Sequence, residues 1–244
     1  MRFATCARFL ATCATLAMLA TALSSCTNTP HATYTHAGGT SFVAKGQRYA
    51  WSFDEANTWK PGTGTPLVDA GPHRTFHAAL GRWQIEKDEA SPSAPNVYRQ
   101  TKRYDGDAEP RVLVGDLVFG DLTLHVKCRR ESGRRGESCG VMFRAADSDN
   151  YLLARADAIA GTIDVVRVLD GSRETIACAR ARAESEPSQW HSLALRTRGE
   201  KIVVSWDGAP ALIAEDDSFP GGKIGLWTSA DSVTAFDDLD VRAD

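Results

Sequence analysis

The segment Gly221–Val241 reads GGKIGLWTSADSVTAFDDLDV and decides the fold class of this chain. Two apolar runs, Ile224–Trp227 and Val233–Val241, flank a polar tip at Ser229–Ser232. Short apolar runs bounded by turn residues are typical of strands. We therefore predict a pair of strands that closes a β-sheet near the end of the chain.

Short strands separated by turn residues continue upstream of this segment. Leu122–Cys128 alternates apolar with polar residues, which indicates one buried face. Asp-Gly pairs at 170–171 and 207–208 indicate hairpin turns, because both residues accept a positive φ. Together with the closing pair, the expected strands are Val97–Thr101, Arg111–Val114, Leu117–Arg129, Cys139–Ala145, Tyr151–Asp157, Thr162–Leu169, Thr175–Arg180, Trp190–Thr197, Lys201–Trp206 and Ala211–Ala214.

The fold class follows from this spacing. After the first 25 residues the chain has no long segment with a 3.6-residue apolar period and no internal repeat. Many short strands with a turn every 8–12 residues or so indicate a sandwich or a barrel. We predict an all-β fold.

The beginning of the chain has the features of an export signal. A basic start precedes the apolar run Phe9–Leu23, which is too short and too rich in Ala and Thr to predict a spanning helix. Leu23-Ser24-Ser25-Cys26 resembles a bacterial lipobox, so we expect cleavage before Cys26 and lipidation of that residue. An ordinary secretory signal is the alternative. Thr27, in the position after the cysteine, implies sorting to the outer membrane.

This reading divides the chain into a lipoprotein signal peptide at 1–25, a tether at 26–46 and one domain at 47–244. The signal carries Arg2 and Arg8 but no acidic residue, so its removal changes the formal net charge from −3 to about −5. Clustered basic residues are needed to bind phosphates, and this mildly acidic chain has no long basic block. We expect a lipid membrane as a partner, through Cys26, and no nucleic acid.

Three cysteines follow Cys26. Cys128 and Cys139 lie at equal distances from the centre of a predicted turn at Gly133-Arg134, so a regular hairpin places them opposite each other. Export to an oxidising compartment favours a disulfide between them. A pair of buried thiols remains the alternative, and Cys178 is expected to stay a thiol.

Several segments together resemble the concanavalin A-like jelly rolls of the 3-keto-disaccharide hydrolase-like and laminin-G-like families. The resemblance covers roughly Trp51 to Val241 and implies two stacked antiparallel sheets, one of them concave. It says little about activity, because sites arise on such folds independently. Its motifs are Asn96–Gln100, Val141–Ala145, Asp149–Arg155, Gln189–Leu193, Val204–Gly208, Gly221–Trp227 and Phe236–Val241.

The sequence gives little support to catalysis. A retaining glycosidase needs two carboxyl groups about 5–5.5 Å apart. Glu86 and Asp88 are in phase, but the third acid of laminarinase-type motifs is missing, and we interpret them as an exposed strand end. His73 and His77 belong to a Gly- and Pro-flanked loop without metal-ligand spacing. We expect His191 to be a satisfied histidine in or near the core.

Asp237, Asp238 and Asp240 raise the question of a metal. On a regular strand Asp238 and Asp240 face one way, while Asp237 faces the other with Leu239 and Val241. Three carboxylates arranged in this way do not converge on one ion, so we predict no cofactor and no metal site. One structural Ca²⁺, held by a single aspartate and backbone carbonyls, stays open.

Binding of glycan fits the sequence best. Sugars stack on aromatic rings and accept hydrogen bonds from Arg and Gln side chains. We expect the site residues on one face of the sandwich, with an outward Arg144 that contributes little to stability; the candidates are Gln100, Arg144, Arg155, Trp227 and Asp231.

The predicted function is that of an exported, glycan-binding lipoprotein of the cell envelope, in the outer membrane. One alternative, which the family resemblance implies, is a glycoside hydrolase or lyase that acts on 3-keto-disaccharides or related sugars. A second alternative is a structural protein of the envelope without a small ligand.

Overall fold

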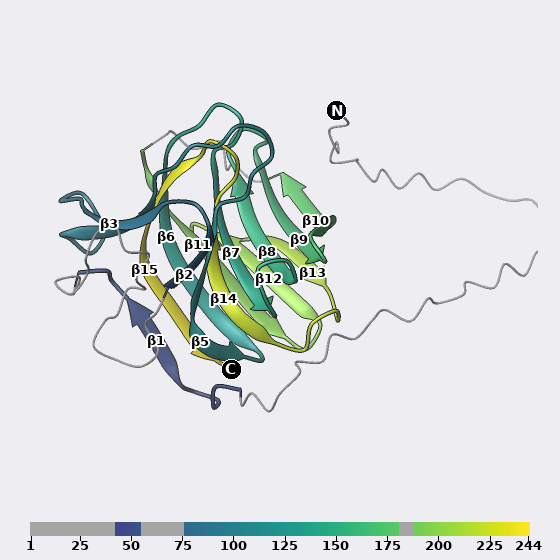
Figure 1. Cartoon of the computed structure of the whole chain (residues 1–244). Coiled ribbons are helices and arrows are strands. Elements are labelled where there is room, and N and C mark those ends of the chain that lie inside the picture. The colour runs from purple at the N-terminus through teal and green to yellow at the C-terminus, as the bar shows by residue number, and fades with distance from the viewer. Residues whose placement is uncertain (1–41, 55–75, 181–187) are drawn as a thin grey trace, which may run out of the picture.

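Residues 42–54, 76–180 and 188–244 of the computed structural model are described here, and they form strands and connecting turns without a helix (Figure 1). This confirms the predicted all-β class. The strands are β1 (Arg48–Trp51), β2 (Phe76–Leu80), β3 (Trp83–Lys87), β4 (Asn96–Gln100), β5 (Arg111–Phe119), β6 (Leu122–Ser132), β7 (Ser138–Ala145), β8 (Tyr151–Asp157), β9 (Thr162–Leu169), β10 (Ser172–Arg180), β11 (Trp190–Arg198), β12 (Lys201–Trp206), β13 (Ala209–Glu215), β14 (Gly222–Trp227) and β15 (Val233–Ala243).

The strands build two antiparallel sheets that stack as the layers of a sandwich (Figure 1). Sheet A has the order β13-β12-β11-β6-β15-β4-β3, and β1 also pairs with β15. Sheet B has the order β10-β9-β8-β7-β14-β5-β2. Among the described strands, six of these pairs join consecutive strands and the other seven join strands that are distant in sequence, so about half of the pairing is non-local.

The closing pair of strands differs from the prediction. β14 and β15 do not close one sheet: β14 lies between β7 and β5 in sheet B, whereas β15 lies beside β6 and β4 in sheet A. The polar tip between them therefore carries the chain from one layer to the other. The apolar residues of both strands can be buried in either arrangement. Their pattern therefore could not distinguish a hairpin within one sheet from a crossing between two sheets.

Strand boundaries near residue 120 also differ from the prediction. The expected strand Leu117–Arg129 is broken at 120–121, and its first residues belong to β5, which continues through Gly115. Gly115 has a φ of 60°, and the register of β5 with β14 shifts in this region. Both Asp-Gly turns are confirmed, since Asp170, Gly171, Asp207 and Gly208 all have positive φ.

The main core lies between the two sheets and takes one residue in two from most strands. On β6, Leu122, Leu124, Val126 and Cys128 are buried in it, as their alternation predicts. A second buried cluster lies on the opposite face of sheet B and contains Met142, Ala145, Tyr151, Leu153, Val166, Val168 and Trp227. Sheet B therefore buries apolar side chains on both of its faces.

A disulfide joins β6 to β7. Cys128 and Cys139 are bonded at 2.01 Å, with their Cα atoms 6.3 Å apart. The bond links the two sheets, because β6 belongs to sheet A and β7 to sheet B. The two residues thus face each other across the sandwich rather than within a regular hairpin of one sheet.

Some expectations concern residues outside the described ranges. The signal peptide at 1–25, the lipidated Cys26, most of the tether and His73 are among them. Within the described ranges, no helix is long and apolar enough to cross a membrane.

Removing the disulfide should weaken the fold without abolishing it. The bond closes a loop of only 11 residues in sequence, so the double variant Cys128→Ser/Cys139→Ser should lose about 2–3 kcal/mol of unfolding free energy. Urea denaturation of the native and variant chains measures this loss, with Cys178→Ser as the control that keeps the bond. A double variant as stable as the native chain would contradict the structural role of the bond.

Candidate functional site

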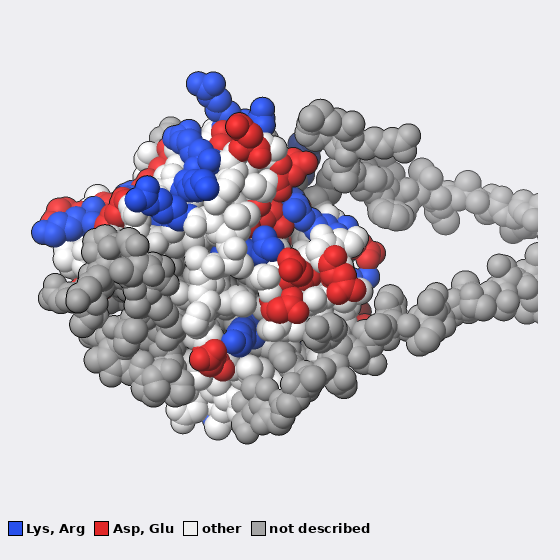
Figure 2. Space-filling model, viewed as in Figure 1, with Lys and Arg blue, Asp and Glu red and all other residues white. Residues whose placement is uncertain are grey.

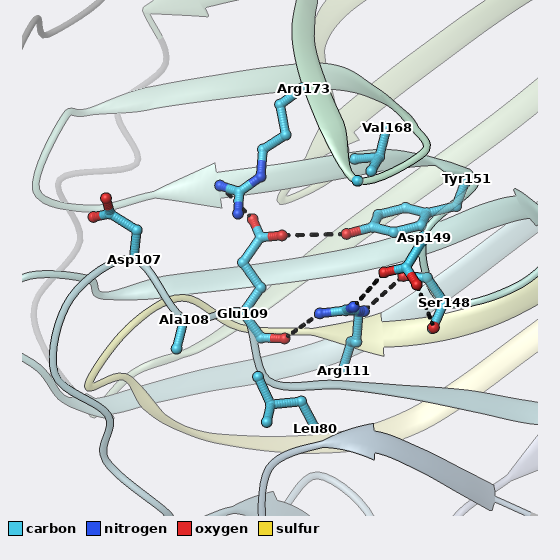
Figure 3. A pocket seen from close by; sticks show the side chains of 11 residues that line it. Leu80, Asp107, Ala108, Glu109, Arg111, Ser148, Asp149, Tyr151, Val168 and Arg173 are labelled. Carbon is cyan, nitrogen blue, oxygen red and sulfur yellow. Dashed lines mark hydrogen bonds and ion pairs between the residues drawn. The ribbon is translucent and has the colours of Figure 1, made fainter.

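A pocket of about 250 Å³ lies on the face of sheet B that points away from the main core (Figure 3). Its walls come from the segment before β5, from the turn between β7 and β8, and from the turn between β9 and β10. The lining residues are Leu80, Asp107, Ala108, Glu109, Arg111, Ser148, Asp149, Tyr151, Val168, Gly171 and Arg173.

Glu109 is the centre of the pocket. Its carboxylate lies 2.7 Å from a guanidinium nitrogen of Arg173 and accepts a hydrogen bond of 3.3 Å from the hydroxyl of Tyr151. Figure 3 shows both side chains pointing toward this carboxylate. Burial raises the pKa of Glu109, although Arg173 and Arg111 act against the rise, and burial also raises the pKa of Tyr151.

Arg111 holds the wall of the pocket that the turn between β7 and β8 forms. From the first position of β5 it donates hydrogen bonds to the backbone oxygen of Ser148 at 2.7 Å and to the carboxylate of Asp149 at 2.9 Å. The turn it reaches is tied to the next turn, since the Gly171 amide donates to the oxygen of Asp149 at 3.0 Å. A side chain of β5 thus holds two turns of sheet B in place.

The pocket presents both hydrogen-bonding and apolar groups to a ligand. The side chain of Arg173 is 43% exposed, and Asp107 is exposed without a side-chain partner among the described residues. Leu80, Ala108 and Val168 add apolar surface. This combination suits a small ligand that has both hydroxyl groups and C–H faces.

Two of the five candidate glycan-binding residues meet on the same face of sheet B. The guanidinium carbon of Arg155 lies 5.6 Å from the centre of the Trp227 ring, and Arg155 is also paired with Asp164 at 3.0 Å. Arg155 is close enough to Glu109 to affect its pKa. The Trp227 ring is completely buried, so Arg155 is the one of the two that reaches solvent.

Gln100 and Asp231 lie at one end of the sandwich, where the chain crosses between the sheets. Gln100 is fully buried and donates hydrogen bonds to the backbone oxygens of Lys102 and Ser232. The carboxylate of Asp231 accepts hydrogen bonds from the amides of residues 134–136. Burial opposes the charge of Asp231, yet these amides lower its pKa. Both side chains hold backbone in place.

Arg144 does not point into solvent as expected. It is 3% exposed and donates hydrogen bonds to the backbone oxygens of Gly199 and Asp216 and to the carboxylate of Asp121. Burial lowers its pKa, while Asp121 and Asp216 oppose that change. Its strand parity does place it outside the main core, but with a φ of 49° its side chain lies buried among the turns at the end of the sandwich opposite to Gln100 and Asp231.

Glu86 and Asp88 are not an exposed strand end. They form ion pairs with Arg99 on the outer face of sheet A, and Asp88 also pairs with Arg129. Burial raises the pKa of Asp88, but the hydrogen bond from Arg129 and other contacts lower it below its usual value. These acids belong to an ion-pair network rather than to a cleft.

His77 and His191 both lie on strands. His77 lies in β2 rather than in a loop. His191 is buried, stacks on Trp206 with ring centres 5.0 Å apart, and shares a hydrogen bond of 2.8 Å between its Nδ1 and Asp207. The expected position in or near the core is found, but the ring is not fully satisfied, because its buried Nε2 has no partner in the described part of the chain.

A bulge changes the orientation of the aspartates on β15. Asp237 and Asp240 are opposite Lys127 and His125 of β6, so both face away from the main core, contrary to the expected parity. Asp238 takes a φ of 47° within this register shift. The buried Asp237 accepts two hydrogen bonds from Ser93, and burial raises its pKa to about 6. Within the described ranges, no group of three or more His, Cys, Asp or Glu side chains could hold a metal ion.

The residues that build the pocket were not among the sequence candidates. Glu109, Tyr151 and Arg173 come from three separate segments, and no spacing connects them. One local signal was present: Glu109-Pro110-Arg111 places two charged residues directly around the start of a buried strand. Such charges have to find partners when the strand packs.

Comparison with solved structures identifies the fold as a jelly roll of the galectin-like and concanavalin A-like kind. A carbohydrate-binding module, CBM66 from Bacillus subtilis, matches with a TM-score of 0.59 and 18% identity over 70% of this chain and 97% of the module. A Bacillus subtilis protein of unknown function with a galectin-like fold matches with a TM-score of 0.51 and 15% identity, over 70% of this chain and 93% of that protein. The Crh5 transglycosylase matches with a TM-score of 0.50 and 10% identity, over 80% of this chain and 84% of the transglycosylase.

No protein-family model matches the sequence, and no curated protein matches it. The identities to the solved structures are low, so these likenesses establish the fold alone.

Replacing Arg144 should destabilise the fold. Arg144→Met removes the donor from two backbone oxygens and a carboxylate in a buried region, which should cost about 3 kcal/mol. Arg48→Met is the matched control: Arg48 is 69% exposed in its ion pair with Asp240, and its loss should cost less than about 1 kcal/mol. Chemical denaturation compares the two variants. Equal stabilities would show that Arg144 is not a structural residue.

Proposed function

We propose that this domain binds carbohydrate and that the pocket on sheet B receives one sugar unit. The observation that carries the proposal is the buried carboxylate of Glu109, held between Arg173 and Tyr151 at the bottom of a small open pocket. The fold shared with a carbohydrate-binding module supports the same function.

The size of the pocket favours a single sugar ring. Its volume of about 250 Å³ is below the range of about 300–1,000 Å³ that is typical of pockets for drug-sized ligands. A ring of this size can place a C–H face against Leu80 and Ala108 while its hydroxyls reach the polar residues.

The chemistry of the pocket favours a neutral sugar. A hydroxyl group both donates and accepts, so it can donate to the carboxylate of Glu109 or Asp107 and accept from Arg173. Figure 2 shows Lys and Arg as well as Asp and Glu side chains on the viewed side of the molecule.

Glu109 should be essential for binding. Glu109→Gln keeps the shape of the side chain and removes the charged acceptor, which should weaken binding by about 10–100-fold. Binding by the native protein should also weaken as the pH falls through the raised pKa of Glu109, since protonation removes the carboxylate, whereas the variant should be insensitive to pH in that range. A glycan-array screen finds the sugar, and calorimetric titration measures the affinities.

Arg48→Met on sheet A is the control for this experiment, because it changes an exposed arginine away from the pocket. Thermal melts of each variant separate loss of binding from loss of folding. Native affinity in a folded Glu109→Gln protein would exclude the pocket as the binding site.

Hydrolysis of a glycoside is a second candidate function for the same pocket. Glycosidases use two carboxyl groups, one of them kept protonated by a raised pKa. Burial raises the pKa of Glu109, and the carboxyl group of Asp107 lines the same pocket. Incubation of the glycans from the screen, and of 3-keto-disaccharides, with the native chain tests this function. Mass spectrometry would then detect cleaved products, and their absence leaves binding alone.

We also propose that the protein is a lipoprotein of the outer membrane, on the basis of Leu23-Ser24-Ser25-Cys26. Cys26→Ser removes the thiol that accepts the lipid, so the variant should remain an uncleaved or soluble precursor. Membrane fractionation with labelled fatty acid measures this change. A variant that still fractionates with membranes and incorporates the label normally would refute lipidation at Cys26.

A further inference from the structure

A second depression lies on the outer face of sheet A, on the opposite side of the sandwich from the pocket. Its volume is also about 250 Å³, and it spans the three neighbouring strands β6, β11 and β12. We call it the sheet A hollow. It is lined by Thr123, His125, Ser192, Ala194, Leu195, Arg196, Val203, Ser205 and Gly208.

Small side chains in the middle of the sheet create this hollow. Ala194 on β11 is directly opposite Ser205 on one side and His125 on the other. Ser192, two residues before Ala194, points to the same face. The aliphatic part of a longer side chain at these central positions would cover the sheet. The small side chains present do not, and the depression is therefore open.

Polar groups around the hollow are available for a ligand. The hydroxyls of Ser192 and Ser205 and the exposed imidazole of His125 make no hydrogen bond with another described residue. Two further groups at the rim are already engaged: Thr123 donates to Asp244 at 2.8 Å, and Arg196 pairs with the same carboxylate at 3.4 Å.

The floor between these groups is apolar. The methyl group of Ala194 and the side chain of Val203 are half-buried and lie on the outer face of the sheet. Neutral groups that can donate and accept, arranged around a small apolar floor, match a hydroxylated ring better than an ion or an extended apolar chain.

We propose that the sheet A hollow is a second saccharide site, which makes the domain bivalent. The class of ligand rests on the proposed function, whereas the place and the chemistry of the hollow stand independently of the pocket. Two sites on opposite faces could each hold a different chain or branch of a glycan, and such linkage raises overall affinity without a new contact at either site.

Nuclear magnetic resonance of the ¹⁵N-labelled full chain tests the proposal. The probes are glucose, galactose, mannose and fructose, each titrated alone at millimolar concentrations. With at least one sugar, the amide signals of Ala194 and Ser205 should shift, as should those of Glu109 and Gly171 in the pocket. Ala194→Gln fills the hollow. It should raise the dissociation constant obtained from the Ser205 shifts at least ten-fold, while the dissociation constant obtained from the pocket amides stays unchanged.

Ile213→Gln is the matched control, because Ile213 is 59% exposed on the neighbouring strand β13 and does not line the hollow. It should leave both responses intact. Shifts confined to the pocket would overturn the second site and leave the proposed function standing. Shifts confined to the hollow would support the second site and overturn the pocket. No shift with any of the four sugars would overturn both.

Discussion

The crossing of the chain from β14 to β15 is the constraint on which the rest of the structure depends. Within six residues the backbone passes from the middle of sheet B to the middle of sheet A, so its polar groups are buried between two layers. Several are satisfied locally: Ser232 accepts from the amide of Ser138 at 3.0 Å, and Gln100 donates to the oxygen of Ser232 at 2.8 Å, whereas the buried hydroxyl of Thr228 has no partner among the described residues. Unpaired, such buried groups would each cost about 1–3 kcal/mol.

The same crossing positions the pocket. The amides of Thr228 and Ala230 donate to the backbone oxygens of Pro110 and Ala108, at 2.9 and 2.7 Å. These bonds hold the segment before β5 along the edge of the crossing, and Glu109 lies between the two bonded residues. The carboxylate is therefore brought to Arg173 and Tyr151 by the backbone of the fold, and the proposed binding group is placed by a connection that also joins the two sheets.

The sequence predicts the fold class and most strands, because apolar alternation and Asp-Gly turns depend on near neighbours alone. It does not predict which sheet a strand joins, and the separation of β14 from β15 is the main example. Predictions of side-chain orientation are wrong where the backbone is irregular: a bulge on β15 turns Asp237 outward, and Arg144 takes a left-handed φ. The pocket could not be predicted, because its charged residues meet only through non-local pairing.

Exposure, rather than residue type, separates binding candidates from scaffold in this protein. Arginine was a reasonable sign of a glycan site, yet Arg144 is buried among backbone oxygens, and Arg99 and Arg129 are held by carboxylates of sheet A. Arg173 also has a carboxylate partner, but it keeps 43% of its side chain exposed at the mouth of a pocket. A guanidinium can serve a ligand only where its remaining donors reach solvent, and among these four arginines that condition favours Arg173.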